Sequence, residues 1–302
     1  MEPAGGFAIP FDVTKKTAWK TLPFFHERWP VLYIDNHLLA VYKPAGLLVQ
    51  GDPTGDPCLL DLAKMWIKER FQKPGNVFLG LVHRLDRPVS GLVLLARTSK
   101  AAGRLSALFR EKRVEKIYLA VVEGCPQKES DTLVHGLVRR ETGGVVLHPE
   151  GAPGTQRAVL HYRTLKTFGG RSLLAVRLET GRKHQIRAQL AHVGCPLVGD
   201  VRYGASAALA HGAVALHAWI MRLEHPTREE PLELLCPLPV GWPWPLKNPD
   251  EPPPHEASRP LWHWRDYHWH APPPFARSPS CHPMPIVKEC NPRGNGRHGP
   301  HS

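Results

Sequence analysis

Hydrophobic and polar residues alternate along most of this chain from Val31 onward, and their spacing predicts an ordered series of strands and helices. Val31–Ile34 and Leu38–Tyr42 flank the turn-rich residues 35–37 and predict a hairpin. Four further runs rich in β-branched and aromatic residues predict strands at Val114–Val122, Ala158–Lys166, Ser172–Leu178 and Leu216–Leu223. Two continuous apolar runs, Val77–Val82 and Leu92–Ala96, are also strand candidates.

Helical spacing of apolar residues occurs in three places. Residues 58–71 carry an apolar stripe that is expected to face the core, made of Leu59, Leu62, Met65, Trp66 and Ile67. Ser99 is expected to cap a second helix that runs to about Arg110, with Leu105, Leu108 and Phe109 facing inward. A third helix is expected over Lys183–Val193, ending at Gly194. Because strands outnumber helices and lack regular helical crossovers, an α+β domain with a mixed, mostly antiparallel sheet and flanking helices is predicted.

Changes in composition divide the chain into three parts. Residues 1–30 show no sustained period and are interpreted as an N-terminal arm, and residues 31–245 are interpreted as the folded, catalytic domain. Residues 246–302 are rich in Pro and His and are expected to be a disordered tail that catalysis does not require. The irregularly spaced His and Cys residues of this tail argue against a preformed metal site.

Charge and cysteine usage narrow the partners and the compartment. The chain has 39 Lys and Arg against 27 Asp and Glu, a net charge of +12, which favours a polyanionic partner such as RNA. Charge alone would equally suit an anionic membrane or a soluble basic surface. The N-terminus lacks a signal-peptide pattern, no apolar run of about 18 residues occurs, and the 6 cysteines form no paired motif. We therefore expect a soluble cytoplasmic protein that does not bind a membrane.

One polar segment lies between the two apolar runs and contains a single carboxylate, Asp86, among His83, Arg84, Arg87 and Ser90. A polar loop between buried strands is a place where a rigid scaffold can present reactive groups. On its own, Asp86 could equally accept turn hydrogen bonds or pair with a neighbouring arginine. Tyr118 and Arg187 are similarly ambiguous when each is considered alone, as a core tyrosine and a surface helix residue.

The combination of motifs resolves this ambiguity, because the chain resembles the RluA-type family of RNA pseudouridine synthases over about residues 31–239. The segments that carry the resemblance are, in order, Lys43-Pro44-Ala45-Gly46, His83-Arg84-Leu85-Asp86 with Ser90-Gly91-Leu92, Lys116-Ile117-Tyr118-Leu119-Ala120, Thr180-Gly181-Arg182-Lys183-His184-Gln185-Ile186-Arg187, Gly199-Asp200 with Tyr203-Gly204, and Leu216-His217-Ala218 with His225-Pro226.

The resemblance implies a role for each central residue. Asp86 would be the nucleophile, Tyr118 would contact the target base, and Arg187 would pair with Asp86 and keep it an anion. Arg84 would help to fill the space left by the extruded base. Val89 stands where the family often has Thr, a difference that concerns support of the loop more than the nucleophile.

The reaction implied by the resemblance breaks the bond between N1 and C1′ of a uridine and joins C5 to C1′. It needs neither a metal nor a redox cofactor. The target nucleotide in rRNA or tRNA would be flipped out, and Arg182 and Lys183, together with Lys112 and Arg113, would bind phosphates. The same charges could also form an ordinary solvated surface. We expect a monomer.

Two other functions each fit part of the sequence. His-Arg-Asp opens the catalytic loop of protein kinases, but here Leu85 separates Arg84 from Asp86, and the other kinase motifs are missing. A non-catalytic RNA-binding protein is the alternative from a different class. The presence of Asp86, Tyr118 and Arg187 together argues against it.

Overall fold

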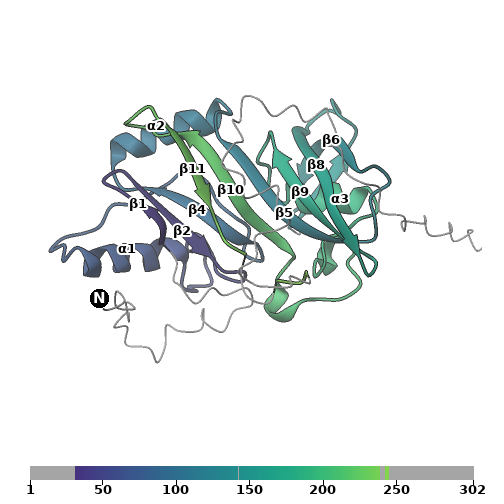
Figure 1. Ribbon diagram of the computed structural model, residues 1–302, viewed down its shortest axis with the longest axis horizontal. Coiled ribbons are helices and arrows are strands. Elements are labelled where there is room, and N and C mark those ends of the chain that lie inside the picture. The colour runs from purple at the N-terminus through teal and green to yellow at the C-terminus, as the bar shows by residue number, and fades with distance from the viewer. Residues whose placement is uncertain (1–30, 142, 239–241, 245–302) are drawn as a thin grey trace, which may run out of the picture.

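One large sheet runs through the part of the chain that the computed structural model describes, which is residues 31–141, 143–238 and 242–244 (Figure 1). Its 11 strands follow the order β1-β2-β4-β10-β5-β9-β8-β6-β7, with β3 beside β4 and β11 beside β10. The strands are β1 (Val31–Ile34), β2 (Leu38–Lys43), β3 (Gly80–Leu81), β4 (Ser90–Ala96), β5 (Glu115–Glu123), β6 (Ser130–Arg139), β7 (Val145–His148), β8 (Gln156–Phe168), β9 (Arg171–Leu178), β10 (Leu216–Glu224) and β11 (Pro231–Leu235). The expected arm at 1–30 and tail at 246–302 lie outside the described residues.

The sheet is mixed and mostly antiparallel, as the sequence pattern predicts. The parallel pair of named strands is β4 with β10, where Ser90 lies opposite His217 and Gly91 opposite Ala218. Gly91 has a φ of +122°, and a Cβ at this position would lie 2.4 Å from backbone atoms of Ala218. Only glycine therefore allows the two strands to approach at this point, which explains the Ser-Gly pair of the motif in physical terms.

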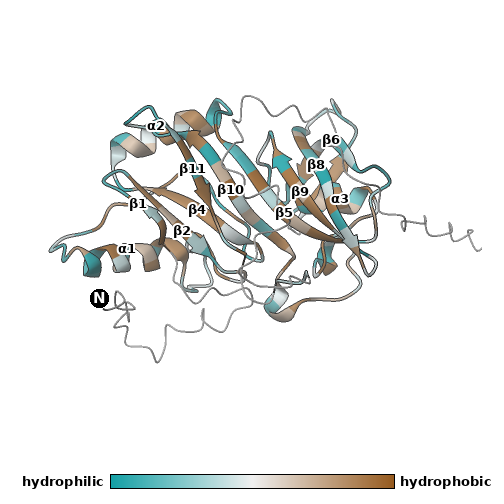
Figure 2. Cartoon of the chain, in the orientation of Figure 1, coloured by the Kyte–Doolittle hydropathy of each residue, from teal (hydrophilic) through white to brown (hydrophobic). Residues whose placement is uncertain are grey.

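Three α-helices in the described residues cover the sheet: α1 (Leu59–Arg70), α2 (Ser99–Arg110) and α3 (Gln185–His192). Leu59 of α1 and Ile186 of α3 belong to the same buried cluster as Val93 of β4, so these two helices cover one face. Leu105 of α2 packs in a different cluster with the alternate residues of β4, among them Leu94, and so covers the opposite face. Both faces of the central strands are therefore buried, and hydrophobic residues are concentrated there (Figure 2).

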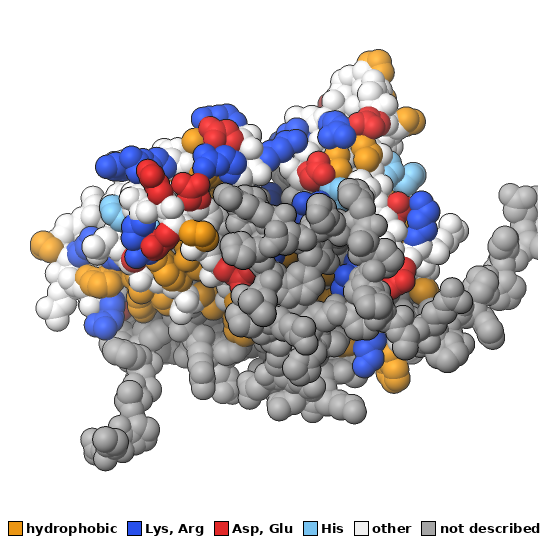
Figure 3. Space-filling model, turned by 45° about the horizontal axis from the view of Figure 1, so that its top comes forward, with side chains coloured by type: hydrophobic (Ala, Val, Ile, Leu, Met, Phe, Trp, Pro, Cys, Tyr) orange, Lys and Arg blue, Asp and Glu red, His pale blue; other side chains and the backbone are white. Residues whose placement is uncertain are grey.

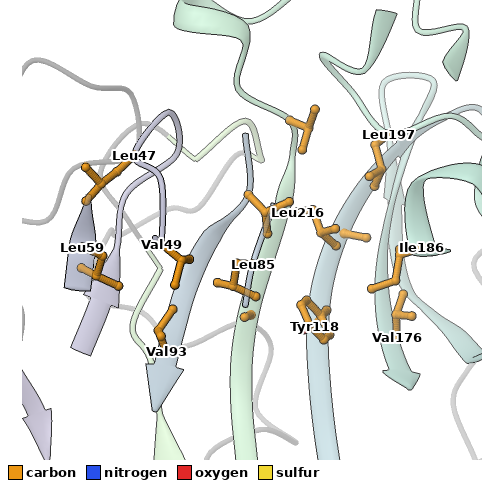
Figure 4. Close-up of a cluster of buried hydrophobic side chains, with 14 of the residues drawn as sticks. Leu47, Val49, Leu59, Leu85, Val93, Tyr118, Val176, Ile186, Leu197 and Leu216 are labelled. Carbon is orange, nitrogen blue, oxygen red and sulfur yellow. The ribbon is translucent and has the colours of Figure 1, made fainter. Parts of the chain in front are cut away.

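The large core cluster continues across the sheet behind the polar loop. Leu85 lies between Val93 of β4 and Tyr118 of β5, and Ile186 lies beyond Tyr118 near Val176 (Figure 4). Leu85 and Ile186 each immediately precede a predicted site residue. Their burial therefore anchors the backbone at Asp86 and at Arg187.

Several element boundaries differ from the expectation. Thr98, not Ser99, caps α2: Thr98 has an extended backbone and its side chain accepts a hydrogen bond from the amide of Ala101, whereas Ser99 is already helical. The third helix begins at Gln185 rather than Lys183, because His184 has a left-handed backbone conformation. The apolar run Val77–Val82 forms only the short strand β3.

His83 fills a gap in the sheet. The start of β4 pairs with β10, whereas Leu95 and Ala96 at its end pair with β3. Between these points the amide of Leu94 donates to Nε2 of His83 over 2.9 Å, and the His83 ring stacks on Phe109. Burial, together with the charge of Lys116, lowers the pKa of His83 to about 3, so the ring is neutral. His83 therefore completes the hydrogen bonding of β4.

Candidate active site

Several of the family-like motifs meet in one row across the sheet. Lys43 lies opposite Gly91, Gly91 opposite Ala218, and Ala218 opposite Tyr118, in β2, β4, β10 and β5. Residues in register on neighbouring strands point to the same face, which here is the face that α1 and α3 cover. Segments far apart in the sequence are thus brought together around the loop between β3 and β4.

Asp86 lies in that loop between two buried residues, Leu85 and Val89, and its own side chain is 28% exposed. The loop is held to the segment after β2 by one main-chain and one side-chain hydrogen bond. The amide of Gly46 donates to the carbonyl of Arg87 over 2.7 Å, and Nε of Arg87 donates to the carbonyl of Gly46 over 3.0 Å. This contact fixes the backbone immediately after Asp86.

Lys43 reinforces the same contact from inside the core. Its ammonium is fully buried and donates to the carbonyls of Pro44, Leu47 and Arg87, at 2.9, 2.8 and 3.1 Å. Burial lowers the pKa of Lys43 to about 7, against the opposing effect of the negative charge of Asp86. A buried amino group with these acceptors ties the end of β2 to the loop that carries Asp86.

Arg187 approaches Asp86 from α3. Its side chain is only 7% exposed and forms a two-pronged ion pair with Asp200, from Nε to Oδ2 at 2.7 Å and from Nη2 to Oδ1 at 2.9 Å. The remaining nitrogen, Nη1, lies 3.5 Å from Oδ2 of Asp86. Burial opposes the charge of Arg187, but the hydrogen bonds and charge of Asp200, assisted by Asp86, raise its pKa. Arg187 is therefore a fixed cation beside Asp86.

Asp200 owes its position to the turn before it. Gly199 has a φ of +90°, and a Cβ there would lie 2.6 Å from the carbonyl oxygen of Ala213. Asp200 precedes the short 3-10 helix η2 (Val201–Tyr203), and the guanidinium carbon of Arg187 lies 5.1 Å from the centre of the Tyr203 ring. Arg187 is thus enclosed by a carboxylate and an aromatic face.

Tyr118 is buried, with 8% of its surface exposed. Burial raises the pKa of its hydroxyl well above the usual range, and the negative charge of Asp86 raises it further. The phenol is therefore neutral and lies close enough to Asp86 to interact with its charge. The structure thus brings together Asp86, Tyr118 and Arg187 from a loop, a strand and a helix.

The basic residues that were expected to contact RNA lie on the surface, and they differ in whether they already form ion pairs within the protein. Arg84, Arg182 and Lys183 are exposed, and Nε of Arg182 donates to the carbonyl of Arg157 over 3.2 Å. Arg113 instead forms ion pairs with Glu224 at 2.7 Å and Glu111 at 3.5 Å. On the face shown in Figure 3, Lys and Arg are spread over both halves of the molecule with Asp and Glu among them.

The described residues offer neither a metal site nor a membrane-spanning helix. No group of three or more His, Cys, Asp or Glu side chains there is arranged to hold a metal ion. None of the helices in this part of the chain has the length and apolar character needed to cross a membrane.

Comparison with known proteins agrees with this arrangement. A sequence model described as RNA pseudouridylate synthase matches residues 37–192, which include Asp86, Tyr118 and Arg187. A Pseudomonas aeruginosa protein named ribosomal large subunit pseudouridine synthase D is 34% identical over 241 residues, covering 71% of this chain and 69% of that protein. This chain belongs to the RNA pseudouridylate synthase family. The family resemblance read from the motifs is confirmed.

Other members of the family agree in sequence and in fold. A Chloroflexus aurantiacus protein named uncharacterized RNA pseudouridine synthase is 39% identical over 201 residues, covering 66% of this chain and 62% of that protein. The solved structure of human RNA pseudouridylate synthase domain containing 4 has a TM-score of 0.59 at 28% identity, covering 70% of this chain and 88% of that chain. The chain matches about two thirds of the length of these two curated relatives. The expected fold class is confirmed.

Three residues around the site received no individual role from the sequence: Lys43, Asp200 and His184. The position of Lys43 at the end of an apolar strand indicated a structural role, because a buried ammonium needs hydrogen-bond acceptors nearby. The Gly199-Asp200 pair is one of the sequence motifs, but only the structure shows that the Asp200 carboxylate pairs with Arg187. His184 lies beside Asp86 with 11% of its side chain exposed, and its Nε2 is 3.7 Å from Oδ2.

Proposed function

We propose that this chain isomerises uridine to pseudouridine in RNA and that Asp86 is the nucleophile. The observation that carries the proposal is the position of Asp86 between a buried, fixed cation, Arg187, and a buried neutral phenol, Tyr118. An anionic carboxylate that is partly exposed and faces a permanent positive charge can attack an electrophilic carbon and leave again as an anion.

The reaction balances without an added oxidant or reductant. The bond between N1 and C1′ breaks, the uracil turns, and a bond forms between C5 and C1′. The hydrogen of C5 leaves as a proton, and N1 gains a proton. Asp86 assists by bonding to the sugar or the base and is released unchanged, while Arg187 stabilises its charge in the free enzyme.

The substrate is a uridine in rRNA or tRNA. Relatives in the family carry the name ribosomal large subunit pseudouridine synthase, which supports rRNA. A uridine in a stacked or paired strand must be extruded to reach Asp86, at a cost on the order of a few kcal/mol. The exposed Arg84 lies two positions before Asp86 and suits the space that the base vacates, Tyr118 suits contact with the base, and Arg182 and Lys183 suit phosphate contacts. The protein acts as a cytoplasmic monomer without a metal or cofactor.

The decisive experiment maps pseudouridines in cellular RNA. Cells that lack the protein should lose pseudouridine at one or a few sites, and expression of the wild-type chain should restore them. Expression of Asp86→Asn at an equal protein level should not. Restoration by both proteins would refute Asp86 as the nucleophile, and an unchanged map in cells without the protein would favour an RNA-binding protein without catalytic activity.

A further inference from the structure

Asp86 has a second neighbour besides Arg187, and the two contacts fall on the same oxygen. Nη1 of Arg187 lies 3.5 Å and Nε2 of His184 lies 3.7 Å from Oδ2 of Asp86. Among the described residues, no hydrogen bond to the other oxygen, Oδ1, is formed. One oxygen of the carboxylate thus faces both Arg187 and His184, and the other faces neither.

The hydrogen bonds of His184 determine which ring nitrogen carries its proton. The amide of Val145 donates to the hydroxyl oxygen of Tyr203 over 3.1 Å, and this hydroxyl lies 2.8 Å from Nδ1 of His184. The Tyr203 hydroxyl accepts from this amide, and its single proton is available to Nδ1 of His184. In this arrangement Nδ1 is the acceptor, and a neutral His184 carries its proton on Nε2, the nitrogen that faces Asp86.

The charges around His184 favour this neutral form. Burial lowers the pKa of His184, and the nearby positive charges of Arg187, Lys183 and Arg202 add to this effect, while Asp86 opposes it. Tyr203 is the remaining titratable group in contact, and burial raises its pKa, so it is a neutral donor. One carboxylate, three cations and one phenol thus act on His184.

The backbone at His184 is shaped to present the ring. Its φ of 53° lies in the left-handed region, which histidine adopts seldom, and Gln185 begins α3 directly after it. The turn is held by the Gln185 side chain, whose Oε1 accepts from the hydroxyl of Thr180 over 2.7 Å and from the amide of Arg182 over 3.1 Å. An unfavourable conformation maintained by specific bonds next to a reactive group is typical of functional sites.

From this geometry we infer that His184 is a positioning residue for the nucleophile: its Nε2–H, oriented by Tyr203, holds Oδ2 of Asp86 so that Oδ1 faces the substrate. This inference rests on the proposed function of Asp86. The separation of 3.7 Å is longer than a hydrogen bond, as is common before substrate binds, and it is expected to shorten in the complex with RNA.

The first test replaces His184 by Asn, which tolerates a left-handed backbone but is too short to reach Asp86. We expect kcat on RNA to fall by about tenfold to a hundredfold, the range for loss of a hydrogen bond to a charged group, with KM little changed. The matched control is His211→Asn, because His211 is an exposed histidine with a φ of 52°. The control should behave as the wild type.

The second test asks whether Tyr203 acts through His184. Tyr203→Phe keeps the ring beside Arg187 but removes the hydroxyl, so both neutral tautomers of His184 become accessible and kcat should fall by roughly twofold or more. In the double variant with His184→Asn, the Tyr203 change should have no additional effect on kcat. Additive losses would mean that Tyr203 acts independently and would contradict the inference.

A third measurement does not depend on activity. Nitrogen-15 NMR of the histidine rings should show His184 protonated on Nε2 in the wild type and as a mixture of tautomers in Tyr203→Phe. Suppose that the wild type is active and that Asp86→Asn is inactive. If His184→Asn then matches the wild type, the inference about His184 fails but the proposed function stands. If the wild type makes no pseudouridine, the proposed function fails, and a His184 protonated on Nδ1 would overturn the hydrogen-bond chain in either case.

Discussion

The two segments that meet at the site are held in different ways. The loop with Asp86 is fixed through backbone atoms, because Lys43 and Gly46 both donate to the carbonyl of Arg87. The segment with Arg187 is fixed mainly through side chains, above all by its ion pair with Asp200. The position of the Asp86 loop thus depends on several neutral carbonyl acceptors, whereas the position of Arg187 depends on one carboxylate.

This difference identifies the most vulnerable point of the site. Loss of one backbone hydrogen bond leaves the Asp86 loop with others, but loss of the Asp200 charge leaves a buried arginine whose other carboxylate neighbour, Asp86, is 3.5 Å away. An uncompensated buried charge is among the most destabilising changes in a protein. Substitutions in the Arg187 segment should therefore cost more stability and activity than substitutions in the Asp86 loop.

Asp200→Asn should have the greatest effect on both stability and activity. We expect the free energy of unfolding, measured in urea, to fall by about 3–5 kcal/mol because Arg187 loses its charged partner. Pseudouridine formation should be lost with it. The double variant Asp200→Asn with Arg187→Met should recover much of the stability, since no buried charge remains, but not the activity. A single variant within about 0.5 kcal/mol of the wild type would contradict the central role of this ion pair.

Lys43→Met should have an intermediate effect that changes with pH. Met fills a similar volume but leaves buried carbonyls of Pro44 and Leu47 without their donor, at about 1–3 kcal/mol for an unsatisfied group. In the wild type the pKa of Lys43 is about 7, below its ordinary value of 10.5. Between these values the unfolded chain binds more protons, so stability should rise with pH across this window. Urea unfolding of Lys43→Met should lack this rise, and an identical pH profile would contradict the assignment.

Sequence patterns predicted much of the fold because the relevant information is local. The hairpin of β1 and β2, the helix α1 and the strands β5, β8, β9 and β10 follow from hydrophobic spacing. The strands β6, β7 and β11 were not predicted, because β7 and β11 are short and β6 contains Gly136 and exposed polar positions.

The site residues likewise fall into those that sequence motifs indicate and those that only tertiary contacts reveal. Asp86, Tyr118 and Arg187 could be selected through motifs, although Asp86 and Arg187 are 101 positions apart. The ion pair of Arg187 with Asp200 and the left-handed backbone of His184 depend on tertiary contacts that no local pattern encodes. Sequence motifs therefore selected the three candidate residues that the structure brings together, but not the residues that hold them in place.

His83→Phe should have the smallest effect on catalysis, because His83 supports β4 rather than the site. Phe keeps the stack on Phe109 but cannot accept the amide of Leu94, so unfolding should become easier by about 1–3 kcal/mol. His83→Gln retains an acceptor and is the control. Because the pKa of His83 is about 3 in the folded chain and 6.5 ordinarily, the wild type should lose stability as pH falls from 6.5 toward 3. A pH profile of His83→Phe that matches the wild type in this range would contradict the account.

Release of tritium from C5 of uridine tests the role of Asp86 most directly, because joining C5 to C1′ displaces the hydrogen at C5. Purified wild-type chain mixed with RNA carrying tritium at C5 should release tritium to water, and so should Asp52→Asn, which changes an exposed carboxylate in the surface turn at Thr54. Asp86→Asn should release none while unfolding in urea like the wild type. Equal release by Asp86→Asn and the wild type would contradict Asp86 as the nucleophile.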